Sequence, residues 1–226
     1  MKKKLYLVRH GQTLFNRKGL IQGWCDSPLT PLGHEQAKAT KKWLEEKQIH
    51  PDSFYCSPLN RTEETLKDIT DQPYKKLDGI KEMYYGELEG EEISRAQAGM
   101  ERNPMGFYVQ FGGEHRRKVG ERMYKAISEV MKTDPAQTIL MCTHGACSFQ
   151  FARLVDDDKA KALRKFNNCT IYEFEYDDEK DEFTLQDVIN EHVKSIEDPD
   201  AQKYKEFYQN KNKILEELGK APQQKD

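Results

Sequence analysis

Two arginines and two histidines stand where they could handle a phosphoryl group. Each lies just after an apolar, strand-like run or at the start of the helix that follows: Arg9, His10, Arg61 and His144. Arginine offers fixed, bidentate N–H donors to phosphoryl oxygens. A neutral imidazole can attack phosphorus. We therefore expect His10 to be a nucleophile, Arg9 and Arg61 to hold the phosphoryl group, and His144 to donate it a further hydrogen bond.

Backbone groups are expected to add to this anion site. Helices are predicted to begin just after Gly11, Asn60 and Gly145, and the first N–H groups of a helix bind anions. Gly11 and Gly145 are therefore candidate phosphate-binding residues.

The pattern of strands and helices explains how such distant residues meet. Apolar runs predict strands over 3–8, 53–56 and 138–142, a shorter one over 77–80, and a pair over 170–176 and 182–188. Helical spacing is found between them, as over 114–131, and Thr30-Pro31 is typical of a helix start. Alternation of this kind predicts a three-layer α/β/α sandwich with a mainly parallel sheet. Residues that follow parallel strands then converge at one edge of the sheet.

Composition limits the alternatives. With 226 residues, 33% of them charged, the chain suits one catalytic domain with a polar surface, and a net charge of −3 argues against a nucleic-acid or anionic-membrane partner. The apolar run after Lys4 is too short for a signal peptide, and no stretch is long enough to span a membrane, so we expect a cytoplasmic protein. The odd, scattered set of five cysteines predicts free thiols and no zinc site.

A family resemblance rests on five segments in chain order. They are Leu7–Thr13, Gln22-Gly23 with Asp26–Thr30 and Gly33, Ser57–Thr62, Glu82–Gly90, and Thr143–Gly145. Together they closely resemble the histidine phosphatase superfamily, also called the phosphoglycerate mutase-like family. An Arg-His-Gly match alone carries little weight, and an isolated histidine is more often structural. Five ordered matches at strand-to-loop positions reverse that judgement.

The resemblance implies further roles. Glu82 would protonate the leaving oxygen, His10 would become phosphohistidine, and Asn16, Gln22 and Gly23 would line the pocket. It also implies an inserted cap over about residues 82–113, no cofactor and no metal. Beyond the resemblance, the strongly polar end of the chain predicts a helical extension over about 194–226, with an amphipathic helix over 204–218. Four aromatic residues are candidates for either the pocket wall or the core: Trp24, Tyr84, Tyr85 and Phe107.

Three functions remain open at this level. The first is a phosphatase for a small phosphorylated metabolite. The second is a phosphoglycerate mutase, which the short cap, with only Arg95 and Arg102 as arginines, disfavours. The third is a catalytically silent phospho-ligand-binding protein. His115, where many family phosphatases have serine, could reach the pocket or cap a helix. The physiological substrate and the oligomeric state, a homodimer among the options, stay open.

Overall fold

A six-stranded sheet forms the centre of the molecule. The computed structural model describes residues 2–165, 167–203, 205–207, 210 and 213–214. The strand order is β3 (Lys75–Lys76), β2 (Ser53–Cys56), β4 (Thr138–Thr143), β1 (Lys2–Arg9), β5 (Ile171–Asp177), β6 (Glu182–Ile189). The first four strands in this order run parallel, β5 is antiparallel to β1, and β6 is antiparallel to β5. The predicted sandwich is confirmed, with a mixed sheet.

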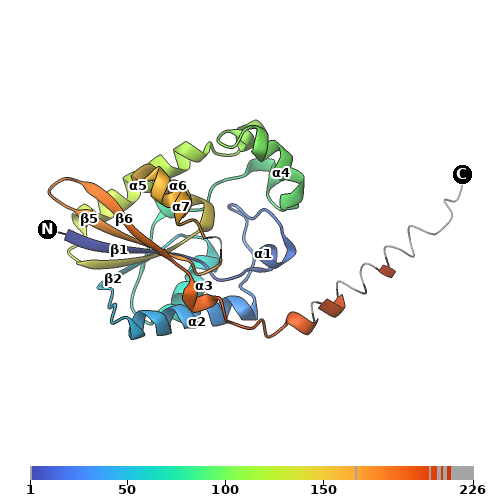
Figure 1. Cartoon of the computed structure of the whole chain (residues 1–226), viewed down its shortest axis with the longest axis horizontal. Helices are drawn as coiled ribbons and strands as arrows, with labels where there is room; N and C mark the ends of the chain where they lie inside the picture. The colour runs from blue at the N-terminus through green and yellow to red at the C-terminus, as the bar shows by residue number, and fades with distance from the viewer. Residues whose placement is uncertain (1, 166, 204, 208–209, 211–212, 215–226) are drawn as a thin grey trace, which may run out of the picture.

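Helices cover both faces of this sheet (Figure 1). Helices α2 (Pro31–Glu46) and α3 (Asn60–Ile69) lie on one side, and α5 (Arg116–Thr133), α6 (Gly145–Val155) and α7 (Asp157–Ala162) lie on the other. Because both faces are covered, the central strands carry apolar side chains toward both sides: Leu5, Leu7 and Met141 pack under α5 and α6, while Tyr6 and Val8 pack toward α2 and α3.

The start of α2 is packed directly against the loop that carries His10. Thr30 caps the helix by accepting a hydrogen bond from the Gly33 N–H at 3.1 Å, and Pro31 is the first helical residue, as predicted. A Cβ atom on Gly33 would lie 2.2 Å from the Gln12 carbonyl oxygen, and one on Gly11 would lie 2.4 Å from the Gly33 carbonyl oxygen. The two backbones touch only because neither residue has a side chain.

Two elements differ from the sequence prediction. The expected strand over 77–80 is wrong: the strand is Lys75–Lys76, followed by the 3-10 helix η1 (Asp78–Ile80). Gly79 packs so closely on α5 that an added Cβ would lie 2.1 Å from Ala126 Cβ, which bends the chain out of the sheet. Helix α7 was not predicted, although Asp156 caps it by accepting from the Lys159 N–H.

Shorter elements lie beyond the carboxyl ends of the parallel strands. They are α1 (Leu14–Lys18), η2 (Gly86–Leu88), α4 (Ile93–Arg102) and η3 (Phe107–Phe111). After η4 (Glu191–Val193), the chain is held to α1, because Arg17 donates to both oxygens of Asp198 at 2.8 and 2.9 Å. The amphipathic helix expected over 204–218 falls largely outside the described residues. All five cysteines are free thiols. Within the described residues, no helix has the length and apolarity needed to cross a membrane.

The contact between Gly33 and the loop after β1 leads to a stability prediction. Gly33→Ala should lower the free energy of unfolding by about 1–3 kcal/mol, because the new methyl group overlaps rigid backbone rather than a movable side chain. Urea denaturation measures the change. Lys38→Ala, at an exposed position of the same helix, should stay within about 0.5 kcal/mol of the parent. Equal midpoints for the two variants would contradict the prediction.

Candidate active site

His10 follows β1 directly and is held in a single orientation. Its backbone N–H donates to the Thr143 carbonyl at 2.9 Å, and its ring Nδ1 lies 2.8 Å from the Gly11 carbonyl oxygen. A carbonyl can only accept, so Nδ1 carries the proton and Nε2 keeps its lone pair. Burial, together with the charges of Arg61 and Arg9, holds the pKa of His10 well below its usual value. The ring is therefore neutral at pH 7, with Nε2 available as a nucleophile.

Arg61 is fully buried at the start of α3. Its Nε–H donates to His144 Nδ1 at 3.1 Å, Nη1 donates to the Cys25 carbonyl and to Asp26 Oδ1 at 3.0 Å each, and Nη2 donates to the Gly23 carbonyl at 2.6 Å. A guanidinium has five N–H donors, so one on Nη2 remains for the cavity. The loop over residues 23–26 and the Arg61 side chain therefore stabilise each other's positions.

His144 lies behind Arg61 and does not line the cavity. Its Nδ1 must accept from Arg61, so Nε2 carries the proton and donates to Ser57 Oγ at 2.8 Å. Burial and the neighbouring Arg61 hold the pKa of His144 well below its usual value. The ring centroids of His144 and His10 lie 5.3 Å apart. In this arrangement both nitrogens of His144 are engaged by protein, and its contribution is to orient Arg61.

Arg9 lies at the end of β1, against the start of α6. A Cβ on Gly145 would lie 3.1 Å from Arg9 Nε, so glycine at that position makes room for the guanidinium. Burial lowers the pKa of Arg9, and the nearby carboxylate of Glu82 opposes this effect. Arg9 therefore supplies a cation whose nearest acidic neighbour is itself a candidate catalytic group.

Glu82 is positioned by the N-terminus of α6. Its Oε1 accepts from the N–H groups of Met83 and Cys147 at 2.8 and 2.9 Å, and Oε2 accepts from Ala146 at 3.2 Å. Glu82 as a residue is 8% exposed. These donors fix the side chain in one orientation, and the longer contact leaves Oε2 the freer of the two oxygens to exchange a proton with a ligand.

A cavity of about 350 Å³ brings most of the predicted residues together. Eight of them line it: Arg9, His10, Asn16, Gln22, Gly23, Arg61, Glu82 and Gly145. Gly11 does not line it. Its N–H donates to Thr65 Oγ1 at 2.9 Å, and its carbonyl orients the His10 ring. Gly11 thus positions His10 and has no N–H left for a phosphate.

Asn16 and Gln22 are oriented from behind. Asn16 Oδ1 accepts from Asn168 Nδ2 at 2.9 Å, which leaves the Asn16 amide N–H groups for the cavity. Gln22 Oε1 accepts from the Thr13 hydroxyl at 2.8 Å. Asn168 also donates to the His10 carbonyl at 3.1 Å. The sequence offered no signal for Asn168, because it lies in a loop outside the five matching segments.

The cavity is also lined by residues that the sequence did not single out. They are Leu20, Ile21, Ile93, Arg116, Ala146, Phe149, Gln150 and Arg164, which join Tyr85, one of the four aromatic candidates. Trp24, Tyr84 and Phe107 do not line it, and neither do Arg95 and Arg102. His115 caps α5 by accepting from the Arg117 N–H at 3.2 Å, which settles its role in favour of the cap.

Glu89 joins the loop over residues 82–90, called here the acid loop, to the loop over residues 23–26 that binds Arg61. Its Oε1 accepts from the N–H groups of Trp24 and Tyr85 at 2.7 and 3.2 Å, and its Oε2 accepts from Cys25 at 2.8 Å. The sequence could not separate Glu89 from the other glutamates of its loop. Three backbone donors on one carboxylate identify it as a positioning residue.

Comparison with known proteins identifies the family. The model of the histidine phosphatase superfamily, branch 1, matches residues 5–189. The chain belongs to this superfamily. The described site is therefore that of a histidine phosphatase superfamily member, and the fold is phosphoglycerate mutase-like.

Several relatives and solved structures are similar to this superfamily member. An uncharacterized phosphatase PhoE of Bacillus subtilis is 28% identical over 193 residues, 83% of this chain and 95% of that protein. A broad-specificity phosphatase of Saccharomyces cerevisiae is 33% identical over 115 residues, 48% of this chain and 50% of that protein, so the chain spans about half of its length. The crystal structure of a phosphoglycerate mutase from Bacillus anthracis has a TM-score of 0.75 at 22% identity, covering 85% of this chain and 95% of that one.

The Glu89 contacts lead to a second prediction. Glu89→Ala should leave three backbone N–H groups without their acceptor and lower the free energy of unfolding by about 1–3 kcal/mol. It should also weaken the binding of inorganic phosphate, because the carbonyls that hold Arg61 are released. Urea denaturation and calorimetry measure the two effects. Glu87→Ala, at an exposed position of the same loop, is the matched control. A Glu89 variant indistinguishable from that control would refute the positioning role.

Proposed function

We propose that this chain is a metal-independent phosphatase that hydrolyses a small phosphomonoester through a phosphohistidine on His10. The observation that carries the proposal is the His10 ring itself. It is neutral, its Nδ1–H is bound to the Gly11 carbonyl, and its unprotonated Nε2 is left to a cavity that Arg9 and Arg61 also line. A neutral, fixed imidazole beside two guanidinium groups suits nucleophilic attack on a phosphoryl group.

In the first step, Nε2 of His10 attacks the phosphorus atom of the ester. The N–P bond forms as the bond from phosphorus to the ester oxygen breaks. The leaving oxygen takes the proton of the Glu82 carboxyl group, so an alcohol departs and Glu82 becomes a carboxylate. Arg9 and the remaining Nη2 donor of Arg61 bind the phosphoryl oxygens, where negative charge is greatest.

In the second step, a water molecule attacks the phosphorus atom of phosphohistidine. The Glu82 carboxylate takes a proton from that water, the N–P bond breaks, and its electron pair returns to His10 Nε2. Inorganic phosphate leaves, and both residues are back in their starting protonation states. Glu82 thus serves as acid and then as base, and the backbone N–H donors of α6 keep its carboxyl group in one position for both tasks.

The site's own side chains support the proposed phosphoryl transfer. Among the described residues, no group of three or more His, Cys, Asp or Glu side chains is arranged to hold a metal ion. Relatives named as phosphatases support hydrolysis. A protein named as a phosphoglycerate mutase has the same fold. The two functions differ in whether water or a second substrate collects the phosphoryl group from His10.

Replacing the nucleophile tests the mechanism. His10→Ala should abolish hydrolysis of 4-nitrophenyl phosphate in EDTA, and it should abolish acid-labile labelling of the protein by a ³²P-labelled substrate. His50→Ala, an exposed histidine, is the control and should retain both. Labelling of the His10 variant would mean that another residue is the nucleophile.

Assays of the parent protein distinguish the remaining functions. Loss of turnover in EDTA would refute the metal-independent mechanism. Interconversion of 3- and 2-phosphoglycerate with a bisphosphoglycerate primer, with little phosphate release, would indicate a mutase. A folded parent protein that turns over no ester would indicate a phospho-ligand-binding protein.

The role of Glu82 leads to a further prediction. Glu82→Gln should slow release of poor alkyl leaving groups by about 10²–10⁴-fold, because they need a proton, and affect 4-nitrophenolate release much less. A series of phenyl and alkyl phosphates measured by kcat/KM gives the dependence on leaving-group pKa. Glu87→Gln is the matched control. An equal loss for every leaving group would argue against the acid role.

A further inference from the structure

The backbone that carries Glu82 is bound from outside the cavity by one arginine of α5. Arg122 Nη1 donates to the carbonyls of Gly79 and Lys81 at 2.8 and 3.0 Å. Its Nη2 donates to the Glu82 carbonyl at 3.3 Å. Nε and Nη2 also donate to the two carboxylate oxygens of Glu114, at 3.1 and 3.0 Å. A guanidinium has five N–H donors, so every donor of Arg122 is engaged by protein.

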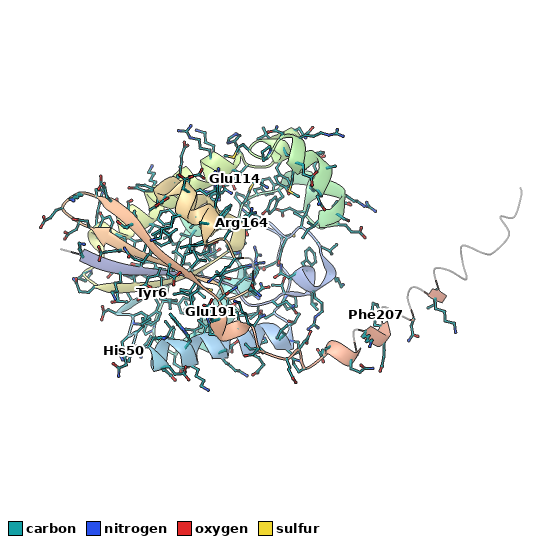
Figure 2. The ribbon with its side chains drawn as sticks, in the orientation of Figure 1. Tyr6, His50, Glu114, Arg164, Glu191 and Phe207 are labelled. Carbon is teal, nitrogen blue, oxygen red and sulfur yellow. The ribbon has the colours of Figure 1, made fainter. Side chains whose placement is uncertain are left out.

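Glu114 extends this set of contacts to the other side of Glu82. Its backbone N–H donates to the Tyr84 carbonyl at 2.8 Å, and its Oε2 accepts from the Tyr84 N–H at 2.8 Å. Figure 2 shows Glu114 on the side of the sheet that α5 and α6 cover. The backbone is therefore bound both before and after the candidate acid, by Arg122 at residues 79–82 and by Glu114 at Tyr84.

Backbone and side chain of Glu82 are held by two helices that are packed tightly together. The backbone is bound from α5, whereas the carboxyl group accepts from N–H groups at the start of α6. A Cβ atom on Gly120 of α5 would lie 2.8 Å from the Gln150 carbonyl oxygen of α6. Because the two helices are in such close contact, both attachments of Glu82 belong to one rigid unit.

The Arg122–Glu114 pair acts through position more than through charge. The two side chains form an ion pair and are only 25% and 22% exposed, so their opposite charges offset each other next to Glu82. Position matters for an acid, because proton transfer requires the two heavy atoms to approach within about 2.6–3.2 Å. A displacement of about 1 Å can slow a reaction by about 100-fold.

We infer that Arg122 and Glu114 are positioning residues for Glu82, and that they place its carboxyl group where it can protonate the leaving oxygen. This inference rests on the proposed function, in which Glu82 is the general acid. Neither residue lines the cavity, so both act through the backbone of residues 79–84 and not through contact with the substrate.

Two substrates of similar shape test the inference. Phenyl phosphate and 4-nitrophenyl phosphate carry the same ring, but the phenolate is the more basic leaving group and has the greater need of a proton. R122Q should lower kcat/KM for phenyl phosphate by about 10-fold or more relative to 4-nitrophenyl phosphate, mainly through kcat. Inhibition by inorganic phosphate should change little, because Arg9 and Arg61 remain in place.

The matched control is R117Q on the same helix. Arg117 pairs with exposed Glu121 at 3.0 Å, and its loss should leave the ratio of the two substrates at the parent value. Because the readout is a ratio, a smaller fraction of folded protein affects both substrates equally and cancels. A ratio for R122Q equal to that of R117Q would overturn the inference.

A double variant separates positioning from a general structural role. In E82Q the acid is already absent, so adding R122Q should change the ratio by less than about twofold. An arginine that supports the site in some other way would impose its full effect in both backgrounds. Separate effects of R122Q and E82Q that simply multiply in E82Q/R122Q would therefore contradict the inference.

The lysine variant separates geometry from charge. R122K keeps the positive charge but has three donors on one nitrogen in place of the planar five-donor group, so it should recover only part of the parent ratio. E114A should shift the ratio in the same direction as R122Q, because Tyr84 and Arg122 both lose a partner. Full recovery in R122K would assign the effect to charge and overturn the positional account.

The two levels of the proposal fail in different ways. A parent protein that releases phosphate from neither aryl ester would refute the phosphatase function. An equal loss for both esters in E82Q would refute the acid role of Glu82, and the inference with it. A parent protein that is active and an E82Q variant that is selective, together with an unselective R122Q, would refute the inference about Arg122 and Glu114 alone.

Discussion

The buried guanidinium of Arg61 is the group on which the rest of the site depends. A fully buried cation is costly unless carboxylate and carbonyl groups surround it, and the chain meets that requirement with Asp26, two loop carbonyls and a histidine nitrogen. The loop after α1, the strand end that carries His144, and α3 are therefore held around a single charge. Glu89 extends the same network to the acid loop. A phosphoryl group would enter a site that is already assembled.

Parallel strands explain why the sequence predicted so much of this site. His10, Ser57 and His144 each follow a parallel strand by one residue, and the register pairs Arg9 with Thr143 and Cys56 with Cys142. An apolar run that ends in a polar motif can be recognised in the sequence alone. The same reading failed at 77–80, where apolar Leu77 and Ile80 suggested a strand, but the packing of Gly79 against α5 decides the conformation.

Other residues could not be predicted because their roles depend on distant contacts. Arg116 and Arg164 are 48 positions apart in the sequence and share no motif, yet both line one cavity. Asn168 acts by orienting Asn16. In the sequence, Glu89 cannot be distinguished from the other glutamates of its loop, but the structure shows three backbone N–H groups donating to its carboxylate. The sequence therefore indicates the cavity residues at strand ends better than it indicates those that line the cavity from helices and loops.

The contact between His10 Nδ1 and the Gly11 carbonyl has a consequence for the chemical identity of the proposed intermediate. Phosphohistidine exists as two isomers, with phosphorus on one or the other ring nitrogen. Because Nδ1 is occupied by its proton and its carbonyl partner at 2.8 Å, a phosphoryl group on His10 would be carried on Nε2, as 3-phosphohistidine. A backbone carbonyl would thus select which of the two covalent isomers forms.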